Sequence, residues 1–312
     1  MVRTLNERTP LIYILFHLAV LLLLPPLLLG VISKTKAWFG GRSGAPLLQS
    51  YYDLAKLMRK GQVLSTTTTW IFRFGPLITL AATLCAGLLI PISSFNAPIS
   101  FTGDLILFAY LFGLARFFTT LAALDTGSAF EGMGSAREVT FACLSEPALF
   151  FALMVLAKLS GSLTLTPMLH HPATALTADT TASLALIAIG LFIVLLAETC
   201  RLPVDDPTTH LELTMIHEAM VLDHSGPLLS VILYASAMKL LVLSTLLLHV
   251  LVPFKTCSLW LNALLYLLEI IGLAGTIGVV ESIMARLQMR HVPYLLLGAM
   301  LFCGFGFILL IR

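Results

Sequence analysis

The sequence predicts an all-α fold, a polytopic membrane helix bundle that forms a single integral membrane domain over residues 1–312. Three observations predict it. Of the 312 residues, 58% are hydrophobic and 11% are charged, whereas soluble domains carry about 25% charged residues. The mean hydropathy is +0.98. Apolar segments of membrane-spanning length recur along the whole chain, and no stretch has the composition of a separate soluble domain.

Eight segments are long and apolar enough to span a membrane, because a bilayer core about 30 Å thick requires about 20 helical residues. They are residues 11–32, 71–92, 104–124, 139–160, 181–200, 228–252, 260–284 and 292–311. The first is too long for a signal-peptide core and lacks a small-residue cleavage site, so we expect it to be retained. Pro25 and Pro26 inside it remove two backbone donors and predict a kink.

Basic residues predict the orientation in the membrane. They concentrate in the loops after the first and seventh spans and are sparse on the opposite side. The positive-inside rule therefore predicts a multi-pass protein of the cytoplasmic (inner) membrane with both termini outside. The fifth loop then faces the cytoplasm.

The first loop contains a predicted amphipathic helix at the cytoplasmic face, "PLLQSYYDLAKLMRK" (Pro46–Lys60). Leu47, Tyr51 and Leu54 fall on one face, and Pro46 suits a first helical position. Two interpretations remain open, a helix lying in the membrane interface and an ordinary surface helix packed against the bundle.

The fifth loop, Ala197–Gly226, is rich in acidic residues and has almost no basic residue to neutralise them. Its carboxylates are Glu198, Asp205, Asp206, Glu212, Glu218 and Asp223. Crowded acids of this kind are typical of residues that exchange protons or meet a basic partner surface, although a plain solvated loop is the alternative. Asp206–Pro207 predicts the start of a helix that reaches about Leu222.

Three histidines in this loop recur every seven residues, at positions 210, 217 and 224. Two helical turns separate neighbours by about 10.5 Å, too far for one metal ion. The pattern therefore favours proton exchange or partner contact. Five scattered cysteines lack any ligand spacing, so we expect no metal or iron–sulfur site held by this chain alone.

Several further charges lie at membrane depth, where an ionisable group costs about 3 kcal/mol or more. They are Arg116, Glu146, Lys239, His249, Glu269 and Glu281. One interpretation is internal ion pairs, such as Arg116 with Glu146 or Lys239 with Glu269. The other is a proton pathway, because carboxylates and lysines in a partly dry channel can load and release protons near neutral pH.

No nucleotide-binding loop, nucleophile–base pair or zinc-protease motif is present, and nothing indicates nucleic-acid binding. The glycine-rich "EGMGSARE" (Glu131–Glu138) does not follow a strand, so it lacks the context for phosphate binding. We expect it to form a tight re-entrant turn against the bundle.

The acidic loop "AETCRLPVDDP…LEL…DHSG" resembles the signature loop of the subunit 1 family of respiratory complex I. That family includes the membrane anchor subunits of formate hydrogenlyase and other energy-converting hydrogenases. Matching positions are Glu198, Arg201, Pro203, Asp205, Pro207, Glu212, Leu213, Asp223, Ser225 and Gly226. Thr208 and His210 replace two family acids.

Three other segments agree with this resemblance. "GAPLLQSYYDLAKLMRK" is similar to the family region after the first span, with "GRSGAP" as a departure. "LDTGSAFEGMGSARE…SEP" (Leu124–Pro147) and "ESIMARLQ" (Glu281–Gln288) resemble the hydrogenase branch more than the quinone-reducing branch.

The resemblance implies a non-catalytic subunit that links a peripheral electron-transfer arm to a membrane arm and opens a proton or ion pathway. Its implied partners are an iron–sulfur relay subunit and a hydrogenase-like large subunit on the cytoplasmic side, antiporter-like membrane subunits, and lipid. Iron–sulfur clusters, and a nickel–iron site where present, would belong to those partner subunits.

Candidate site residues follow from the family positions and from charge at membrane depth. The resemblance carries over Glu146, Glu198, Asp205, Glu212, Asp223 and Glu281 to the proton or ion pathway, and charge adds Asp206, Glu218, Lys239 and Glu269. The candidate partner contacts are Arg42, Asp53, Lys56, Lys60, Arg137, Arg201 and Arg286.

Three other functions stay open at this point. A quinone-reducing complex I-type subunit is disfavoured by "GRSGAP" and by the absent acids at positions 208 and 210. A stand-alone secondary transporter would favour inverted repeats and midplane acids, and neither is evident. The third is a purely structural anchor without ion traffic.

Overall fold

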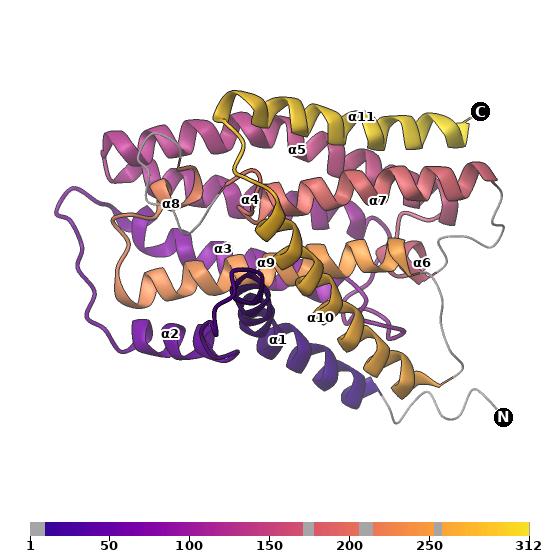
Figure 1. Ribbon diagram of the computed structural model, residues 1–312, viewed down its shortest axis with the longest axis horizontal. Helices are drawn as coiled ribbons and strands as arrows, with labels where there is room; N and C mark the ends of the chain where they lie inside the picture. Colours follow the sequence, from indigo (N-terminus) through magenta and orange to yellow (C-terminus); the bar gives the residue numbers. More distant parts are fainter. Residues whose placement is uncertain (1–9, 171–177, 206–214, 253–257, 312) are drawn as a thin grey trace.

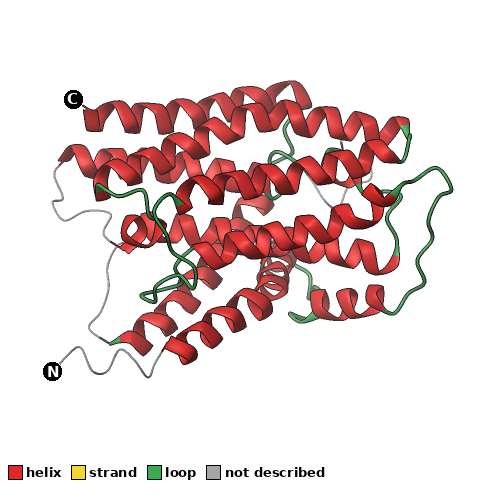
Figure 2. Cartoon of the chain, turned by 180° about the vertical axis from the view of Figure 1, so that it is seen from behind, coloured by secondary structure: helices red, strands yellow, loops and turns green. Residues whose placement is uncertain are grey.

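The computed structural model describes residues 10–170, 178–205, 215–252 and 258–311. Within these ranges the chain is helical, with no strand (Figure 2). The helices are α1 (Pro10–Phe39), α2 (Gln49–Met58), α3 (Trp70–Leu89), α4 (Asp104–Asp125), α5 (Ala129–Ser160), α6 (Leu165–His170), α7 (Ala178–Glu198), α8 (His217–Met220), α9 (Gly226–Leu251), α10 (Leu259–Ile283) and α11 (Val292–Ile311), with a 3₁₀ turn at Met289–His291.

The predicted fold class is confirmed. Eight helices of the described chain are long and apolar enough to cross a membrane: α1, α3, α4, α5, α7, α9, α10 and α11. Most of their bounds agree with the predicted spans within three residues. The helix of α1 continues through Pro25 and Pro26 and ends seven residues later than predicted, at Phe39.

Helix α9 lies at the centre of the bundle. In the most apolar 18-residue stretch of α9, 72% of the residues are buried, whereas 22–50% are buried in the corresponding stretches of the other seven spans. It contacts α1, α2, α3, α6, α7 and α10. On one side α11 packs on α5 and α7, on the other α1 packs against α10, and α3 pairs with α4 (Figure 1). Side chains on α9 can therefore meet groups from most other helices.

The two ends of the bundle carry different elements. Helices α2 and α8 lie at one end, which we call the acidic-loop end, together with the start of α9 (Figure 1). Helix α6, the start of α1 and the end of α11 lie at the opposite end, the far end. The first and fifth loops thus share one side of the membrane, as the charge pattern predicts.

The predicted amphipathic helix exists as α2, and it contains no fully buried residue. The Oγ of Ser230 on α9 donates a hydrogen bond to the carbonyl oxygen of Leu54 at 3.2 Å. The Tyr51 hydroxyl donates to the Leu23 carbonyl on α1. These contacts place α2 against α1 and α9 and leave much of its surface open.

The expectation of a re-entrant turn at Glu131–Glu138 was wrong, because this segment forms the first turns of α5, a continuous helix from Ala129 to Ser160. Glycine lowers helix propensity, but Gly134 is needed here for packing. A Cβ at Gly134 would lie 2.8 Å from the Ala219 Cβ and 2.9 Å from the Ile216 carbonyl oxygen. The glycine therefore allows the end of the acidic loop to pack closely on α5.

Candidate functional site

The site is centred on Glu198, the last residue of α7, whose side chain is 6% exposed. Its two carboxylate oxygens lie 2.5 and 2.6 Å from Arg116 Nη2 on α4. Lys239 Nζ on α9 lies 2.6 Å from Glu198 Oε2, and the Ser145 hydroxyl on α5 donates to Oε1 at 2.6 Å. Four helices thus converge on one buried carboxylate, and the two cations offset the cost of its burial.

A helix-ending motif holds Glu198 in this position. Cys200 has a positive φ of 53°, a left-handed conformation that is usually reserved for glycine at a helix end. The Cys200 N–H donates to the Ala197 carbonyl, and the Arg201 N–H donates to the Leu196 carbonyl at 2.8 Å. These bonds stop α7 directly after Glu198 and turn the chain back toward α10.

Arg116 joins Glu198 to two further carboxylates, both on α5. It forms an ion pair with Glu146, as predicted, and its Nε lies 3.4 Å from Glu138 Oε1. The group therefore holds three carboxylates (Glu138, Glu146, Glu198) and two cations (Arg116, Lys239). We call these five residues the charge cluster. The cluster therefore holds one more carboxylate than cations.

Glu198 borders three cavities. One of about 50 Å³ lies between α3, α4, α5 and α9 and is lined by Thr79, Thr119, Glu138, His217 and Lys239 among others. Such a volume holds a few waters, because one water needs about 10–15 Å³. A smaller cavity of about 10 Å³ reaches Asp205. A third, of about 320 Å³, extends past Arg116 and Glu146 toward Tyr110 and Phe150 on the outer surface of α4 and α5.

Asp205 ties the acidic loop to the end of α10. Its Oδ1 accepts from Arg286 Nη2 at 2.9 Å. Its Oδ2 lies 3.3 Å from the Ile216 N and 3.2 Å from the His217 N, both of which donate. The Asp205 side chain is almost fully buried. Together with the small cavity, this position makes Asp205 the neighbour of Glu198 toward the acidic-loop end.

Glu281 on α10 forms a second buried carboxylate site with two cations. Lys36 Nζ lies 2.9 Å from Oε2, and Arg201 Nη1 lies 3.3 Å from Oε1. The Glu281 side chain is completely covered. Glu281 and Arg201 were predicted as site residues from the sequence, whereas Lys36 was not. The extension of α1 places Lys36 at this site.

The predicted ion pair between Lys239 and Glu269 was wrong. Lys239 binds Glu198, and Glu269 lines a separate cavity at the far end. The two residues lie on α9 and α10, and the rotation of each helix about its axis decides which neighbour a side chain meets. Sequence separation alone does not determine that rotation.

Glu131 and Glu138 were not predicted as site residues, because their segment was expected to form a turn. On α5 the residues Glu131, Glu138 and Ser145 are spaced by seven, so they lie near one face with a drift of about 20° per heptad. Glu131 is fully buried, and its Oε1 accepts from the Asp223 N–H at 3.0 Å. A helical interpretation of "EGMGSARE" would have identified this stripe.

The other acidic candidates do not join the charge cluster. Asp223 has an exposed side chain and Glu218 is half-buried on α8. Asp206 and Glu212 lie outside the described residues, as do Pro207 and His210. The single helix predicted from Pro207 to about Leu222 was wrong over its described part, where only His217–Met220 is helical.

Of the two described histidines of this loop, His224 is buried and His217 is half-buried. Burial lowers the pKa of the His217 imidazole, which lines the cavity beside Glu198. Burial also lowers the pKa of His224 to about 4, and its ring stacks on Phe72 with centroids 3.9 Å apart. The expected partner contact does not suit these two side chains, because neither offers an exposed surface.

His224 makes the folded state sensitive to acid. Its folded pKa of about 4 lies below the ordinary value of 6.5, so its contribution is fully present above pH 6.5 and lost as the pH falls toward 4. We expect the melting temperature to fall less on acidification in His224→Phe than in the wild type. The lowered pKa of His224 corresponds to about 3 kcal/mol of stability that is lost at the acid limit. The exposed His291→Gln should melt like the wild type, and equal acid sensitivity of His224→Phe would contradict the prediction.

The candidate partner contacts divide into two groups. Arg42, Asp53, Lys56 and Lys60 are exposed on the first loop and α2. Arg201 and Arg286 are largely covered in the ion pairs with Glu281 and Asp205. Arg137 donates from Nη1 to the Met215 carbonyl at 2.8 Å. The first group offers charge to a partner, whereas the second holds the acidic loop in place.

No group of three or more histidine, cysteine or carboxylate side chains converges as a metal site within the described ranges. The described chain presents buried titratable groups bordered by cavities and exposed charges at the acidic-loop end. Carboxylates, imidazoles and lysines of this kind can bind protons, and exposed charges can contact a protein partner.

Sequence comparison identifies the class. The chain belongs to the NADH dehydrogenase family of complex I subunit 1-type proteins, whose sequence profile matches residues 12–312. The resemblance seen in the acidic loop is thereby confirmed, and the protein is a multi-pass membrane protein of this family.

Two curated relatives come from the hydrogenase branch. The chain is 30% identical over 302 residues to hydrogenase-4 component C of Escherichia coli (strain K12), with 94% of each chain covered. It is 29% identical over 305 residues to formate hydrogenlyase subunit 4 of the same organism, with 95% of each covered. The fold is similar to that of a chain in the membrane-bound sulfane sulfur reductase, an archaeal respiratory membrane complex, with a TM-score of 0.82, 20% identity and coverage of 96% and 98%.

Proposed function

We propose that this chain is the membrane anchor and proton-pathway subunit of a membrane-bound hydrogenase complex of the formate hydrogenlyase type. The observation that carries the proposal is Glu198, a buried carboxylate held between Arg116 and Lys239 and bordered by three cavities. The two curated relatives, a hydrogenase-4 component and a formate hydrogenlyase subunit, support the class of complex.

In this function protons enter at the acidic-loop end and reach the charge cluster by way of Asp205. The small cavity between Asp205 and Glu198 and the larger one beside Lys239 supply space for water along this path. The third cavity leads from Arg116 and Glu146 to the surface of α4 and α5. That surface exposes Tyr110, Phe117 and Phe150 and is suited to contact a second membrane subunit, the antiporter-like partner.

Redox chemistry takes place in the partner subunits of this assembly. An iron–sulfur relay subunit and a hydrogenase-like large subunit would dock at the acidic-loop end, bringing their iron–sulfur clusters and a nickel–iron site. The exposed charges of Arg42, Asp53, Lys56 and Lys60 would contribute to that docking. Lipid covers the apolar sides of the bundle.

The proposal predicts that a complex purified by a tag on this chain evolves hydrogen from a reduced viologen dye. Quinone analogues should leave this rate unchanged, because the proposed complex does not reduce quinone. The measurement is hydrogen output with and without the analogue. Strong inhibition, or quinone reduction without hydrogen output, would instead favour a quinone-reducing complex I-type assembly.

Reversing two charges, one on α2 and one just after it, tests the docking surface. The double substitution Lys56→Glu and Lys60→Glu should release the soluble arm during purification, because both side chains are exposed and charge reversal at a complementary interface is costly. The measurement is the yield of soluble subunits that copurify with the tagged chain. Lys158→Glu, an exposed lysine near the far end, is the matched control and should leave the yield unchanged, and full retention in the double variant would contradict the docking role.

A further inference from the structure

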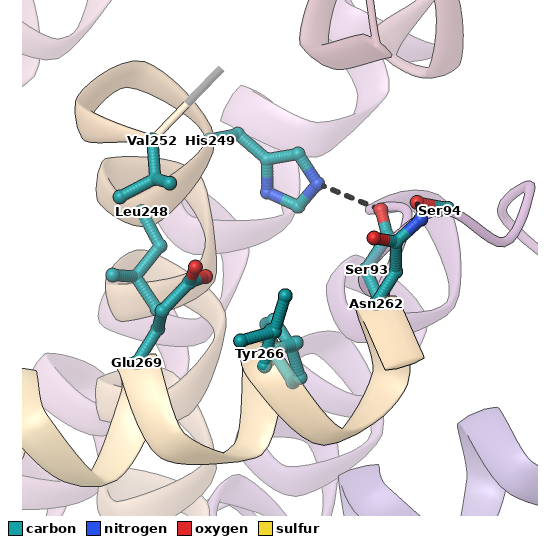
Figure 3. A pocket seen from close by; sticks show the side chains of 9 residues that line it. Ser93, Ser94, Leu248, His249, Val252, Asn262, Tyr266 and Glu269 are labelled. Carbon is teal, nitrogen blue, oxygen red and sulfur yellow. Dashed lines mark hydrogen bonds between the residues drawn. The ribbon is translucent and has the colours of Figure 1, made fainter. Parts of the chain in front are cut away.

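A separate polar cavity lies at the far end of the bundle, away from the charge cluster. It measures about 40 Å³ and is bordered by the last turn of α9, the first half of α10 and the Ser93–Ser94 segment after α3. Figure 3 shows His249, Tyr266, Asn262 and Glu269 lining it. Its volume admits a few waters. None of its lining residues borders the three cavities beside Glu198.

The surroundings of His249 fit an imidazole that carries two protons. Its Nδ1 lies 2.8 Å from the Thr245 carbonyl oxygen. Its Nε2 lies 3.3 Å from the Ser93 carbonyl oxygen, the contact that is dashed in Figure 3. A carbonyl oxygen only accepts, and a neutral imidazole has a single N–H. Both contacts are therefore hydrogen bonds only in the imidazolium form.

Two other features favour a positive charge at this position. His249 lies in the last turn of α9, where the helix dipole stabilises a cation. Glu269 on α10 lines the same cavity, which places a carboxyl group in the same polar space as the ring. The other titratable groups that face His249 in the described chain are Tyr266 on α10 and His170 on α6, whose ring lies 6.4 Å from that of His249.

Ser93 is held in an unusual backbone conformation that presents its carbonyl to His249. It has a positive φ of 58°, and the only other non-glycine residue of the described chain with a positive φ is Cys200 beside the charge cluster. A serine in the left-handed region of backbone angles is strained, and residues strained in this way cluster at functional sites. Each of these two left-handed residues lies beside a polar cavity, Cys200 at the charge cluster and Ser93 at the far end.

The two sites are separate along α9. Lys239 and His249 are ten residues apart, which corresponds to about 15 Å of helix. Buried apolar side chains, among them Leu241, Leu243 and Leu246, lie between them. A proton on His249 therefore exchanges with the far side of the membrane and not directly with Glu198.

We propose that this cavity is a proton-binding site at the far membrane face, in which His249 binds the proton as imidazolium and Glu269 is its counter-ion. The proton arrives from water at the far face and binds the ring nitrogen that faces Ser93 or Thr245. On release the imidazolium returns it to water and becomes neutral. The binding site itself stands on its own geometry, whereas its use in translocation rests on the proposed function.

The test compares melting temperatures of the purified complex over a pH series. Raising the pH through the range in which imidazolium loses its proton should lower the melting temperature of the wild type, since one of the two carbonyl contacts is then lost. His249→Gln should lose this pH-dependent fall, because glutamine does not titrate. Glu269→Gln should shift the fall to lower pH, because the counter-charge is gone.

His17→Gln is the matched control, because His17 is equally buried but has one carbonyl partner, Gly87, which a neutral ring satisfies at 3.0 Å. It should keep the pH dependence of the wild type. Parallel curves for the wild type and His249→Gln would overturn the proposal. This measurement needs no turnover, so it tests the proton-binding site even if the complex translocates no protons.

A second measurement addresses translocation. In vesicles, His249→Gln should reduce the pH gradient formed per hydrogen released several-fold, whereas His17→Gln should not. An unchanged gradient in His249→Gln would overturn the role in translocation. Absence of any gradient in the wild type would instead count against the proposed function. The melting curves would then still test the proton-binding site.

Discussion

Glu198→Gln should lower proton translocation by the assembled complex by about tenfold or more, the scale on which a positioned proton-transfer group contributes. Glutamine keeps the size of the side chain and can still accept hydrogen bonds from Arg116 and Lys239, so the complex should assemble. It cannot take up and release a proton. The measurement is the pH gradient formed in inverted vesicles during hydrogen release, together with the subunit composition of the purified complex.

Ser145→Ala is the control for this substitution. It removes the 2.6 Å hydrogen bond to Glu198 but leaves the carboxylate in place, so translocation should stay close to that of the wild type. A Glu198→Gln complex that assembles and forms the full pH gradient would show that the cluster only joins helices. The structural-anchor interpretation would then be the better one.

Arg116→Gln should have the largest effect on stability. The substitution leaves Glu138, Glu146 and Glu198 with Lys239 as the remaining cation of the cluster. Removing one partner of a buried ion pair costs about 3–5 kcal/mol, so we expect a clear drop in the melting temperature and a low yield. Thermal unfolding of the purified complex in detergent measures it.

The double variant Arg116→Gln with Glu198→Gln separates charge from packing. If the loss arises from uncompensated carboxylates, neutralising Glu198 should recover part of the melting temperature, because coupled residues are not additive. Arg73→Gln, an exposed arginine on α3, should change little. A double variant that is less stable than Arg116→Gln alone would contradict this account.

Hydropathy predicted the eight spans well because a bilayer imposes a length and an apolar composition on every crossing helix. The prediction failed where helices extend beyond the hydrocarbon. Residues 129–138 of α5 are polar and contain two glycines, so they lacked the signal of a span. The close approach of Ala219 to Gly134 requires a glycine there. The sequence does not reveal this contact, because the two residues are far apart along the chain.

Charges at membrane depth were a sound guide to where polar sites lie, since an ionisable group in a span is costly without a partner. They were a poor guide to partners. The pairing of Arg116 with Glu146 was predicted correctly, but Lys239 binds Glu198 instead of Glu269. Glu138 and Lys36 were missed because their helices reach further than the apolar pattern indicates.

The sequence by itself determined that this is an eight-span membrane protein of the complex I subunit 1 type, with acids gathered at one face, because lipid selects composition and the acidic loop is distinctive. Only the tertiary structure decided which charges meet. It brought Arg116, Glu198 and Lys239 together from three helices and placed the Ser93 carbonyl against His249, 156 residues away. Those contacts depend on the rotation and extension of packed helices, which are set by side-chain fit across the bundle and not by the order of residues along it.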